Sequence, residues 1–283
     1  MARPYSPSVR RRRLSKQLRR MREDAGYTLH GASTRLKWAR AKLGRMEKSE
    51  LKTVKPADLD ALMELYGVDD PATREALHQL AREAKHKGWW WKYRDIFGSE
   101  PLPDFETEAS LIRTYEVATV PGLLQTPDYA EAVFRGGRYT SLDHIKRQVE
   151  ARVSRREILN RFEKPPRLWA VIDEAALRRP IGGVEVMRGQ LDYLLRVGQS
   201  ANIDIQVLPF AAGAHAALGS PFTILDFPEP LDLPIVYTDS VGAGLFEETE
   251  EEVADCVAIF GEIQGAAMST VQSAELIEAI MKE

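Results

Sequence analysis

The chain has 283 residues, of which 44% are hydrophobic and 29% are charged. This composition is that of an ordinary globular protein, which argues against a disordered, collagen-like or membrane-spanning chain, and the length exceeds the roughly 100 to 200 residues of one domain. The net charge of −3 combines two opposite regions, because residues 1–87 hold 21 basic and 11 acidic side chains whereas the remainder holds 18 and 31. Such an asymmetry predicts a polyanion-binding module followed by an acidic domain.

Neither a secretion signal nor a membrane span is evident in the sequence. The N-terminal segment is polar and basic through Arg20, without the apolar core of a signal peptide, and no stretch approaches the about 20 apolar residues that cross a bilayer. We therefore expect a cytoplasmic protein. Cys256 is the single cysteine, so it can form no internal disulfide and supplies no CxxC pair, and we expect neither a metal nor another cofactor.

Helical signals dominate residues 1–87 and predict a small all-α domain of five helices. Apolar residues recur at helical spacing from Leu14 to Ala25. The second and third helices are joined by Lys37 and Trp38 alone, which is the short connection of a helix-turn-helix. The predicted helices cover about 12–25, 29–36, 39–48, 56–66 and 71–85.

The third predicted helix carries side chains suited to reading DNA. Leu43 and Met46 share its core face, which leaves a basic face opposite. Because arginine can donate two hydrogen bonds to the O6 and N7 of guanine, and alanine can contact a thymine methyl, we expect Arg40, Ala41 and Arg45 to read bases. Lysine suits phosphates. The expected phosphate contacts are Lys42, Lys48 and Lys52, with a flexible arm of Arg10, Arg11, Arg12 and Arg13 ahead of the first helix. The alternative is a merely solvated basic surface.

Three segments of the N-terminal region carry a specific pattern. They are the helix end and turn at residues 22–28, the segment LKWARAKLGRMEKSE at residues 36–50 and the segment ELYGV at residues 64–68. With these segments, residues 18–66 resemble the repressor-type helix-turn-helix of the Xre and phage repressor family. The resemblance implies a five-helix DNA-binding fold.

The resemblance also implies one ion pair and shows two departures. In that family an arginine late in the first helix commonly pairs with the glutamate that follows the last core residue of the recognition helix, which corresponds to Arg22 and Glu47 here. Paired charges are tolerated in a small core, where a single one is not. The family often has a serine or threonine cap where this chain has Ala39, and a phosphate-binding glutamine where it has Leu29.

A second domain over residues 88–283 is predicted to be α+β, with a mixed sheet and flanking helices. Its first part is helical, at about 128–134 and 142–162. Period-two apolar runs between glycine and proline signals follow, and they predict strands at 168–173, 203–208, 222–227 and 234–240. A helix at 184–199 separates the first two strands, and two more at about 248–267 and 271–282 end the chain.

Four segments of this second domain are distinctive. They are EASLIRTYEVATVPGLLQTPDYA at 108–130, RVSRREIL at 152–159, LWAVIDEAALRRPIGG at 168–183 and IQVLPFAAGAHAALGSPF at 205–222. The domain resembles the large domain of WhiJ-like actinobacterial regulators. The resemblance implies a transcription factor that acts with a small BldB-like partner protein in a toxin–antitoxin-like arrangement, and it names no ligand.

Two parts of the second domain are candidates for an effector or partner site. The segment PGLLQTPDYA leads into a helix whose N-terminus could accept an anion, although a structural cap is the plainer alternative. The small-residue loop at 213–219 presents a lone histidine between two predicted strands, which could equally be structural or exposed. The candidate residues are Gln125, Thr126, Tyr129 and His215. We expect Arg152, Arg155 and Arg156 to form ion pairs within the domain rather than a second DNA-binding patch.

Signals for catalysis are weak, and we expect no enzyme activity. The chain has no GxSxG, HExxH, P-loop or CxxC motif, and its nearest nucleotide signal, at 242–244, has Glu247 at the position of the third glycine. A hydrolase built from the remaining polar groups stays open, although their spacing does not favour it. Those groups are Asp173, Glu174, His215 and Asp239.

Two functional hypotheses follow, and both include double-stranded DNA as a partner. In the first, a small BldB-like protein modulates an antitoxin-like regulator, and in the alternative a small-molecule effector does so. A close-packed pocket near residues 121–129 and His215 would favour the small molecule, whereas an exposed apolar groove would favour the protein. We expect a homodimer on a pseudo-palindromic operator, because one recognition helix reads too few base pairs for specificity.

Overall fold

The computed structural model describes residues 6–51, 53–98, 102–137, 141–228, 233–240 and 243–283. It consists of two compact units, Met1–Lys92 and Tyr93–Glu283, where the sequence predicted a boundary between residues 87 and 88. Each unit is described by itself. Among the described helices, none is both long enough and apolar enough to span a membrane.

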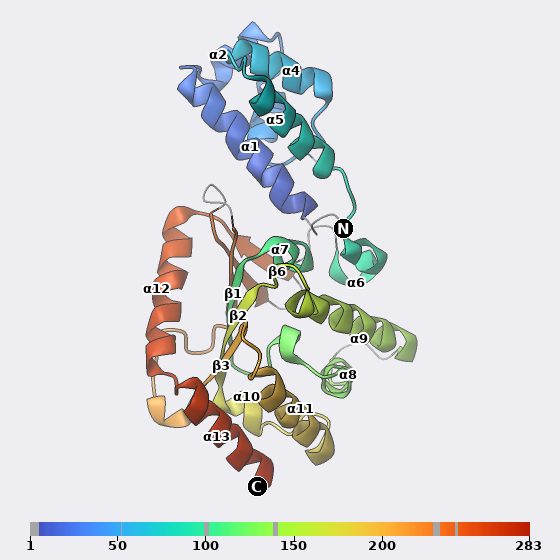
Figure 1. Ribbon diagram of the computed structural model, residues 1–283, viewed down its shortest axis with the longest axis vertical. Helices are drawn as coiled ribbons and strands as arrows, with labels where there is room; N and C mark the ends of the chain where they lie inside the picture. The colour runs from blue at the N-terminus through green and yellow to red at the C-terminus, as the bar shows by residue number, and fades with distance from the viewer. Residues whose placement is uncertain (1–5, 52, 99–101, 138–140, 229–232, 241–242) are drawn as a thin grey trace. The chain divides into compact units, whose positions relative to one another are not determined.

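The first unit is all-α, as predicted. Its helices are α1 Pro7–Asp24, α2 Leu29–Arg35, α3 Arg40–Glu47, α4 Pro56–Leu65 and α5 Pro71–Glu83 (Figure 1). Local signals define their starts, because proline occupies the first turn of α1, α4 and α5 and a side-chain cap precedes α1, α2 and α5. Leucine and methionine side chains from α1, α3 and α4 form the centre of the core. They include Leu14, Leu18, Leu43, Met46, Leu59, Leu62 and Met63.

The first helix begins earlier than predicted. Ser6 caps it by accepting a hydrogen bond from the Val9 backbone N–H at 3.0 Å, and Pro7 follows as its first residue. The expectation of a flexible basic arm at Arg10, Arg11, Arg12 and Arg13 is therefore wrong, because all four lie within α1. Arginine is a good helix former, so the run continues a helix once a cap is present.

A tight turn joins α2 to α3. Lys37 adopts a left-handed conformation with φ 55°, and the Trp38 N–H donates to the Ser33 carbonyl at 2.9 Å. This bond satisfies a carbonyl near the end of α2 that the helix itself leaves unpaired. The turn thereby brings α3 directly after α2, which is the arrangement that a helix-turn-helix requires.

The second unit contains a six-stranded sheet with flanking helices, so the predicted α+β class with a mixed sheet is confirmed. The strands are β1 Leu111–Glu116, β2 Arg167–Asp173, β3 Ile203–Leu208, β4 Phe222–Asp226, β5 Ile235–Ser240 and β6 Ala243–Glu247. The helices are α6 Arg94–Phe97, α7 Leu102–Glu108, α8 Pro127–Arg135, α9 Leu142–Arg156, α10 Glu174–Arg178, α11 Val184–Val197, α12 Glu250–Ala266 and α13 Thr270–Lys282. Short 3₁₀ turns are η1 Trp89–Tyr93, which crosses the boundary between the units, η2 Gly122–Leu124, η3 Glu157–Asn160 and η4 Phe210–Ala212.

The strand order β3-β2-β1-β4-β5-β6 divides the sheet into a parallel and an antiparallel half. β1 pairs in parallel with β2, and β2 with β3, so each connection must cross over the sheet through helices. β4, β5 and β6 join by antiparallel pairing, which needs no such crossover. β1 lies at the junction of the two halves, with β2 on one side and β4 on the other.

The two faces of the sheet have different cover, as Figure 1 shows for α12 on one side and α8, α9 and α11 on the other. On the α12 face, Tyr115, Val171 and Ile224 form an apolar core with Phe260 and Ile263 of α12. On the opposite face, the crossover helices cover the parallel half. The antiparallel half of that face is left to line a cavity, described below.

Two strands were not predicted from the sequence. The segment of β1 was assigned to no strand, although it is the strand at the junction of the sheet, and β6 was treated only as a glycine-containing segment after a strand. In β1 the polar side chains Arg113, Thr114 and Glu116 interrupt the apolar pattern on which strand prediction depends.

Candidate nucleic-acid interface and cavity

The exposed face of α3 presents the side chains that were expected to contact DNA. Leu43 and Met46 of α3 are buried in the core with 0% and 2% exposure, which fixes the orientation of the helix. Arg40, Ala41 and Arg45 are exposed, and so is Lys48 immediately after the helix. As the sequence indicated, Ala39 at the N-cap makes no side-chain hydrogen bond.

An ion pair fixes α3 against α1. The Arg22 guanidinium donates from Nε and Nη2 to the two carboxylate oxygens of Glu47 at 2.7 and 2.8 Å, and from Nη1 to the Tyr27 carbonyl at 2.7 Å. Both side chains are below 10% exposure. The hydrogen bonds that Arg22 donates to Glu47 are the main reason that the pKa of Arg22 is raised, against the opposing effect of burial. The pair therefore joins the end of α1, the residue before the α2 cap and the end of α3.

The remaining predicted phosphate contacts differ in their surroundings. The Lys42 ammonium lies 2.6 Å from an Asp58 carboxylate oxygen and 3.7 Å from the centroid of the Trp38 ring, so it links α3 to α4 and to the turn. Arg10 forms an ion pair with Glu83 of α5 at 3.1 Å. Lys52 lies outside the described residues. Lys48 is thus the lysine that remains on the exposed basic surface of α3.

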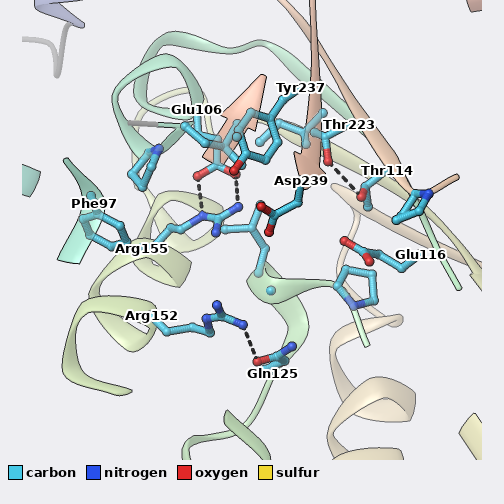
Figure 2. Close-up of a pocket in the computed structure, with 18 of the residues that line it drawn as sticks. Phe97, Glu106, Thr114, Glu116, Gln125, Arg152, Arg155, Thr223, Tyr237 and Asp239 are labelled. Carbon is cyan, nitrogen blue, oxygen red and sulfur yellow. Dashed lines mark hydrogen bonds and ion pairs between the residues drawn. The ribbon is translucent and has the colours of Figure 1, made fainter. Parts of the chain in front are cut away.

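The second unit contains a cavity of about 990 Å³ between the antiparallel half of the sheet and the helices opposite it (Figure 2). One cross-strand row of the sheet forms part of its wall, because the register aligns Thr114, Thr223, Tyr237 and Phe246 on β1, β4, β5 and β6. The hydroxyls of Thr114 and Thr223 are hydrogen-bonded at 3.0 Å. Further lining residues come from α6, α7, η2, α8 and α9.

Two arginines of α9 face this cavity, three residues apart. Arg155 donates from Nε and Nη2 to both oxygens of Glu106 on α7, each at 2.6 Å. It thus forms an internal ion pair, although with a distant residue rather than with a neighbour on its own helix. Burial acts to lower the pKa of Arg155, but the attraction of Glu106 outweighs this and the pKa is raised. Arg152 instead donates to the side-chain oxygen of Gln125 at 2.8 Å.

Carboxylates on the sheet face the same cavity. Burial raises the pKa of Glu116, at the end of β1, to about 7, and the nearby charge of Asp239 on β5 adds to the effect, whereas Arg155 and Arg152 oppose it. Burial also raises the pKa of Tyr237 to about 12. The Tyr237 ring lies over Gly244 of β6, where a Cβ atom would overlap the ring. Glycine at this position thereby leaves room for the tyrosine.

The structure brings Gln125 to the cavity and gives the other predicted effector residues different places. Gln125 also donates to the Val120 carbonyl at 2.7 Å, so its amide is held from both ends. Thr126 caps α8, and the Tyr129 hydroxyl accepts the Val120 N–H at 3.1 Å in the interior. His215 lies beside Tyr115, 3.3 Å from its hydroxyl, in the region of the α12 core. Among the described lining residues, Gln125 is the only one of these four.

Several cavity residues carried no signal in the sequence. Glu106, Glu116, Thr223 and Tyr237 stand in separate elements, so sequence spacing could not group them, although Glu116 lies within the distinctive segment 108–130. The arginines at 152 and 155 were noted as a charged helix face, and their three-residue spacing placed them on one side of the helix. The three-dimensional structure was needed to show that this side of α9 faces the cavity and the row of side chains on the antiparallel half of the sheet.

These features define the class of protein. The first unit has an exposed basic helix after a tight turn, and its sequence matches a helix-turn-helix family model. The chain is therefore a DNA-binding regulator of the helix-turn-helix class. A family model described as a helix-turn-helix domain matches residues 13–77, and a model described as a domain of unknown function (DUF5753) matches residues 100–279. Because the second match covers more than half of the sequence, the chain belongs to the DUF5753 family. No curated protein and no solved structure matches the chain.

Proposed function

We propose that the chain is a homodimeric, sequence-specific transcription regulator that recognises a pseudo-palindromic operator. The observation that carries the proposal is the exposure of Arg40, Ala41 and Arg45 opposite the buried face of α3. Arg40 and Arg45 read guanines, Ala41 contacts a thymine methyl and Lys48 contacts phosphate. One such helix covers few base pairs, so a two-fold assembly with half-sites about one helical turn apart supplies the specificity. The function is one of binding, without a catalytic step or a cofactor.

Selection of bound sequences from random DNA, followed by footprinting, identifies the operator. Arg45→Ala weakens operator binding by about 1 to 3 kcal/mol and relaxes the base preference at one position, whereas Lys48→Ala weakens operator and random DNA alike and reduces the salt slope by about 1. Arg188→Ala is the matched control, because Arg188 is exposed on α11 of the other unit. Equal losses on operator and random DNA for Arg45→Ala would contradict base reading by α3, and sedimentation that finds only a monomer on the operator would contradict the dimer.

We further propose that a small molecule in the second unit modulates DNA binding. The cavity of about 990 Å³ supports this alternative, because its volume falls within the roughly 300 to 1,000 Å³ of ligand sites. Its lining combines many polar and charged side chains with apolar ones, so a ligand would be bound largely by polar contacts. Its test is a change of operator affinity on addition of a cavity ligand.

A small BldB-like protein in an antitoxin-like pair is the other candidate modulator. Its support is the resemblance of residues 108–130 and 205–222 to WhiJ-like regulators. Operator titrations with and without a purified small protein of that type separate the two candidates. A change of affinity with the protein alone would favour the antitoxin-like arrangement over the small-molecule effector.

A further inference from the structure

Opposite charges face the cavity of the second unit from two walls without contacting one another. Arg152 extends from α9, whereas Glu116 and Asp239 extend from β1 and β5 (Figure 2). Within the described ranges of the chain, no ion pair joins Arg152 to either carboxylate. The other charged pair of the cavity, Arg155 with Glu106, is closed on itself by two hydrogen bonds and leaves little net charge for a ligand.

Arg152 is a half-buried cation with N–H donors that have no acceptor within the described residues. Its guanidinium lies 4.7 Å from the centroid of the Phe134 ring, and its hydrogen-bond acceptor among the described residues is Gln125. A guanidinium has five N–H donors, so one acceptor leaves most of them available. Burial, together with the like charge of Arg155, lowers the pKa of Arg152 to about 10, so the group stays cationic near neutral pH. Within the described residues, no carboxylate forms an ion pair with it.

The two carboxylates lie on one cross-strand row at the end of the sheet. The register that aligns Tyr115 with Phe222, and Thr223 with Tyr237, places Glu116 and Asp239 on either side of Pro221, two strands apart. Neighbouring strands are about 4.8 Å apart, so the backbones of these two residues are separated by roughly 10 Å. Pro221 also lines the cavity between them. Asp239 is solvent-exposed and Glu116 is half-buried.

The balance of charge selects among classes of ligand. A phosphate or other simple anion would be attracted by Arg152 and repelled by two carboxylates. A simple cation would satisfy the carboxylates, but it would add positive charge beside Arg152 and leave this half-buried guanidinium without a counterion. A molecule with separate negative and positive groups satisfies both walls. Aromatic and aliphatic side chains that also line the cavity, including Ile112, Leu123, Phe134 and Phe246, provide contacts for an apolar body.

We propose that this cavity binds a zwitterionic small molecule, with a carboxylate against Arg152 and a protonated amine between Glu116 and Asp239. The inference rests on the proposed function only in taking the cavity as the effector site, and the charge arrangement itself involves no residue of the DNA-binding unit. Amino acids, short peptides and larger amine carboxylates share this chemistry, and the volume admits a molecule larger than a single amino acid.

Matched probes test the charge requirement on the full chain in the absence of DNA near pH 8, where Glu116, with its pKa of about 7, is ionised. The probes are straight-chain ω-amino carboxylic acids of increasing length, each compared by calorimetry with the monocarboxylic acid and the monoamine of equal length. At the best length, the zwitterion binds at least about tenfold more tightly than either single-charge analogue, equivalent to about 1.4 kcal/mol. Equal affinity of an analogue, or no binding by any zwitterion of the series at millimolar concentration, would overturn the proposal.

Two variants assign the two ends of the ligand. Arg152→Gln abolishes the advantage of the zwitterion over the amine, and Glu116→Gln reduces its advantage over the acid, with Asp239 retaining part of it. Arg188→Gln and Glu185→Gln, exposed on α11, are the matched controls and leave all affinities unchanged. Circular dichroism checks the fold, and if Arg152→Gln does not fold, the probe series and Glu116→Gln still decide.

The outcome is separable from that of the proposed function. Operator binding is measured on the same preparations. If the chain binds its operator but shows no preference for the zwitterion, the zwitterion proposal alone is overturned. If the chain prefers the zwitterion but binds no operator, the proposed function as a sequence-specific regulator alone is overturned.

Discussion

Glu116→Gln is expected to stabilise the second unit at high pH and to leave its stability unchanged at low pH. Burial raises the pKa of Glu116 from 4.5 to about 7 in the folded chain, so the folded state holds its proton more tightly than the unfolded state does. The stability that this provides is complete below pH 4.5 and is lost as the pH rises through 7. The difference between the two pKa values corresponds to up to about 3 kcal/mol at about 1.4 kcal/mol per pH unit.

Glutamine has the shape of the protonated glutamate and cannot ionise, so the variant avoids this loss. We expect the free energy of unfolding of Glu116→Gln to exceed that of the native chain by up to about 3 kcal/mol near pH 8 and to equal it near pH 4. The Glu116 carboxylate is faced by Arg152 and Arg155 on α9 and by Asp239 and Tyr237 on β5. The upward shift of its pKa already includes the lowering effect of the two arginines and the raising effect of Asp239.

Native-state hydrogen exchange of the β1 and β2 amides measures the opening of the second unit without contribution from the first. The matched control is Glu185→Gln, because its side chain is 87% exposed on α11, and its effect is expected to be independent of pH. A variant at position 116 that is less stable than the native chain near pH 8, or whose advantage is the same at both pH values, would refute the burial of this carboxylate as the cause.

Three further predictions test other contacts. Arg22→Met leaves the buried carboxylate of Glu47 unpaired and lowers the free energy of unfolding of the first unit by about 3 to 5 kcal/mol, and thermal unfolding should find that adding Glu47→Leu recovers part of this loss. Lys42→Ala leaves the salt slope of operator binding nearly unchanged, since its ammonium is already paired; a reduction by about 1 would instead indicate a phosphate contact. Gly244→Ala destabilises the second unit by about 1 to 3 kcal/mol through overlap with the Tyr237 ring, and the penalty should disappear in a Tyr237→Ala background.

The first unit could be predicted from its sequence because local signals define it. Thr28 caps α2, and Pro56 and Pro71 open α4 and α5, so these helices begin at the positions that the sequence indicated. The start of α1 was missed although Ser6 and Pro7 form the same kind of signal, because the arginine run after them was interpreted as an arm. The arginine run at residues 10–13 was identified as basic from the sequence, but it was not predicted to be part of α1.

The cavity could not be predicted because its walls depend on long-range pairing. The polar side chains of β1 find their partners more than 100 residues away, since Arg113 pairs with Asp226 and Thr114 with Thr223. Such partners make a buried polar strand stable, but no sequence signal near β1 predicts them. The position of Glu116 in the cavity wall could not be predicted, because it depends on the register that places β1 beside the antiparallel half of the sheet.

A ligand in the cavity regulates DNA binding only if the two binding events are thermodynamically coupled, and coupling acts equally in both directions. A zwitterion that changes operator affinity by some factor must have its own affinity changed by the same factor when the operator is saturating. Coupling of about 1 to 3 kcal/mol would appear as about a 5- to 150-fold change in both titrations. If the zwitterion binds equally well with and without the operator, the cavity is a binding site without a regulatory role, and base reading by Arg40 and Arg45 stands on its own.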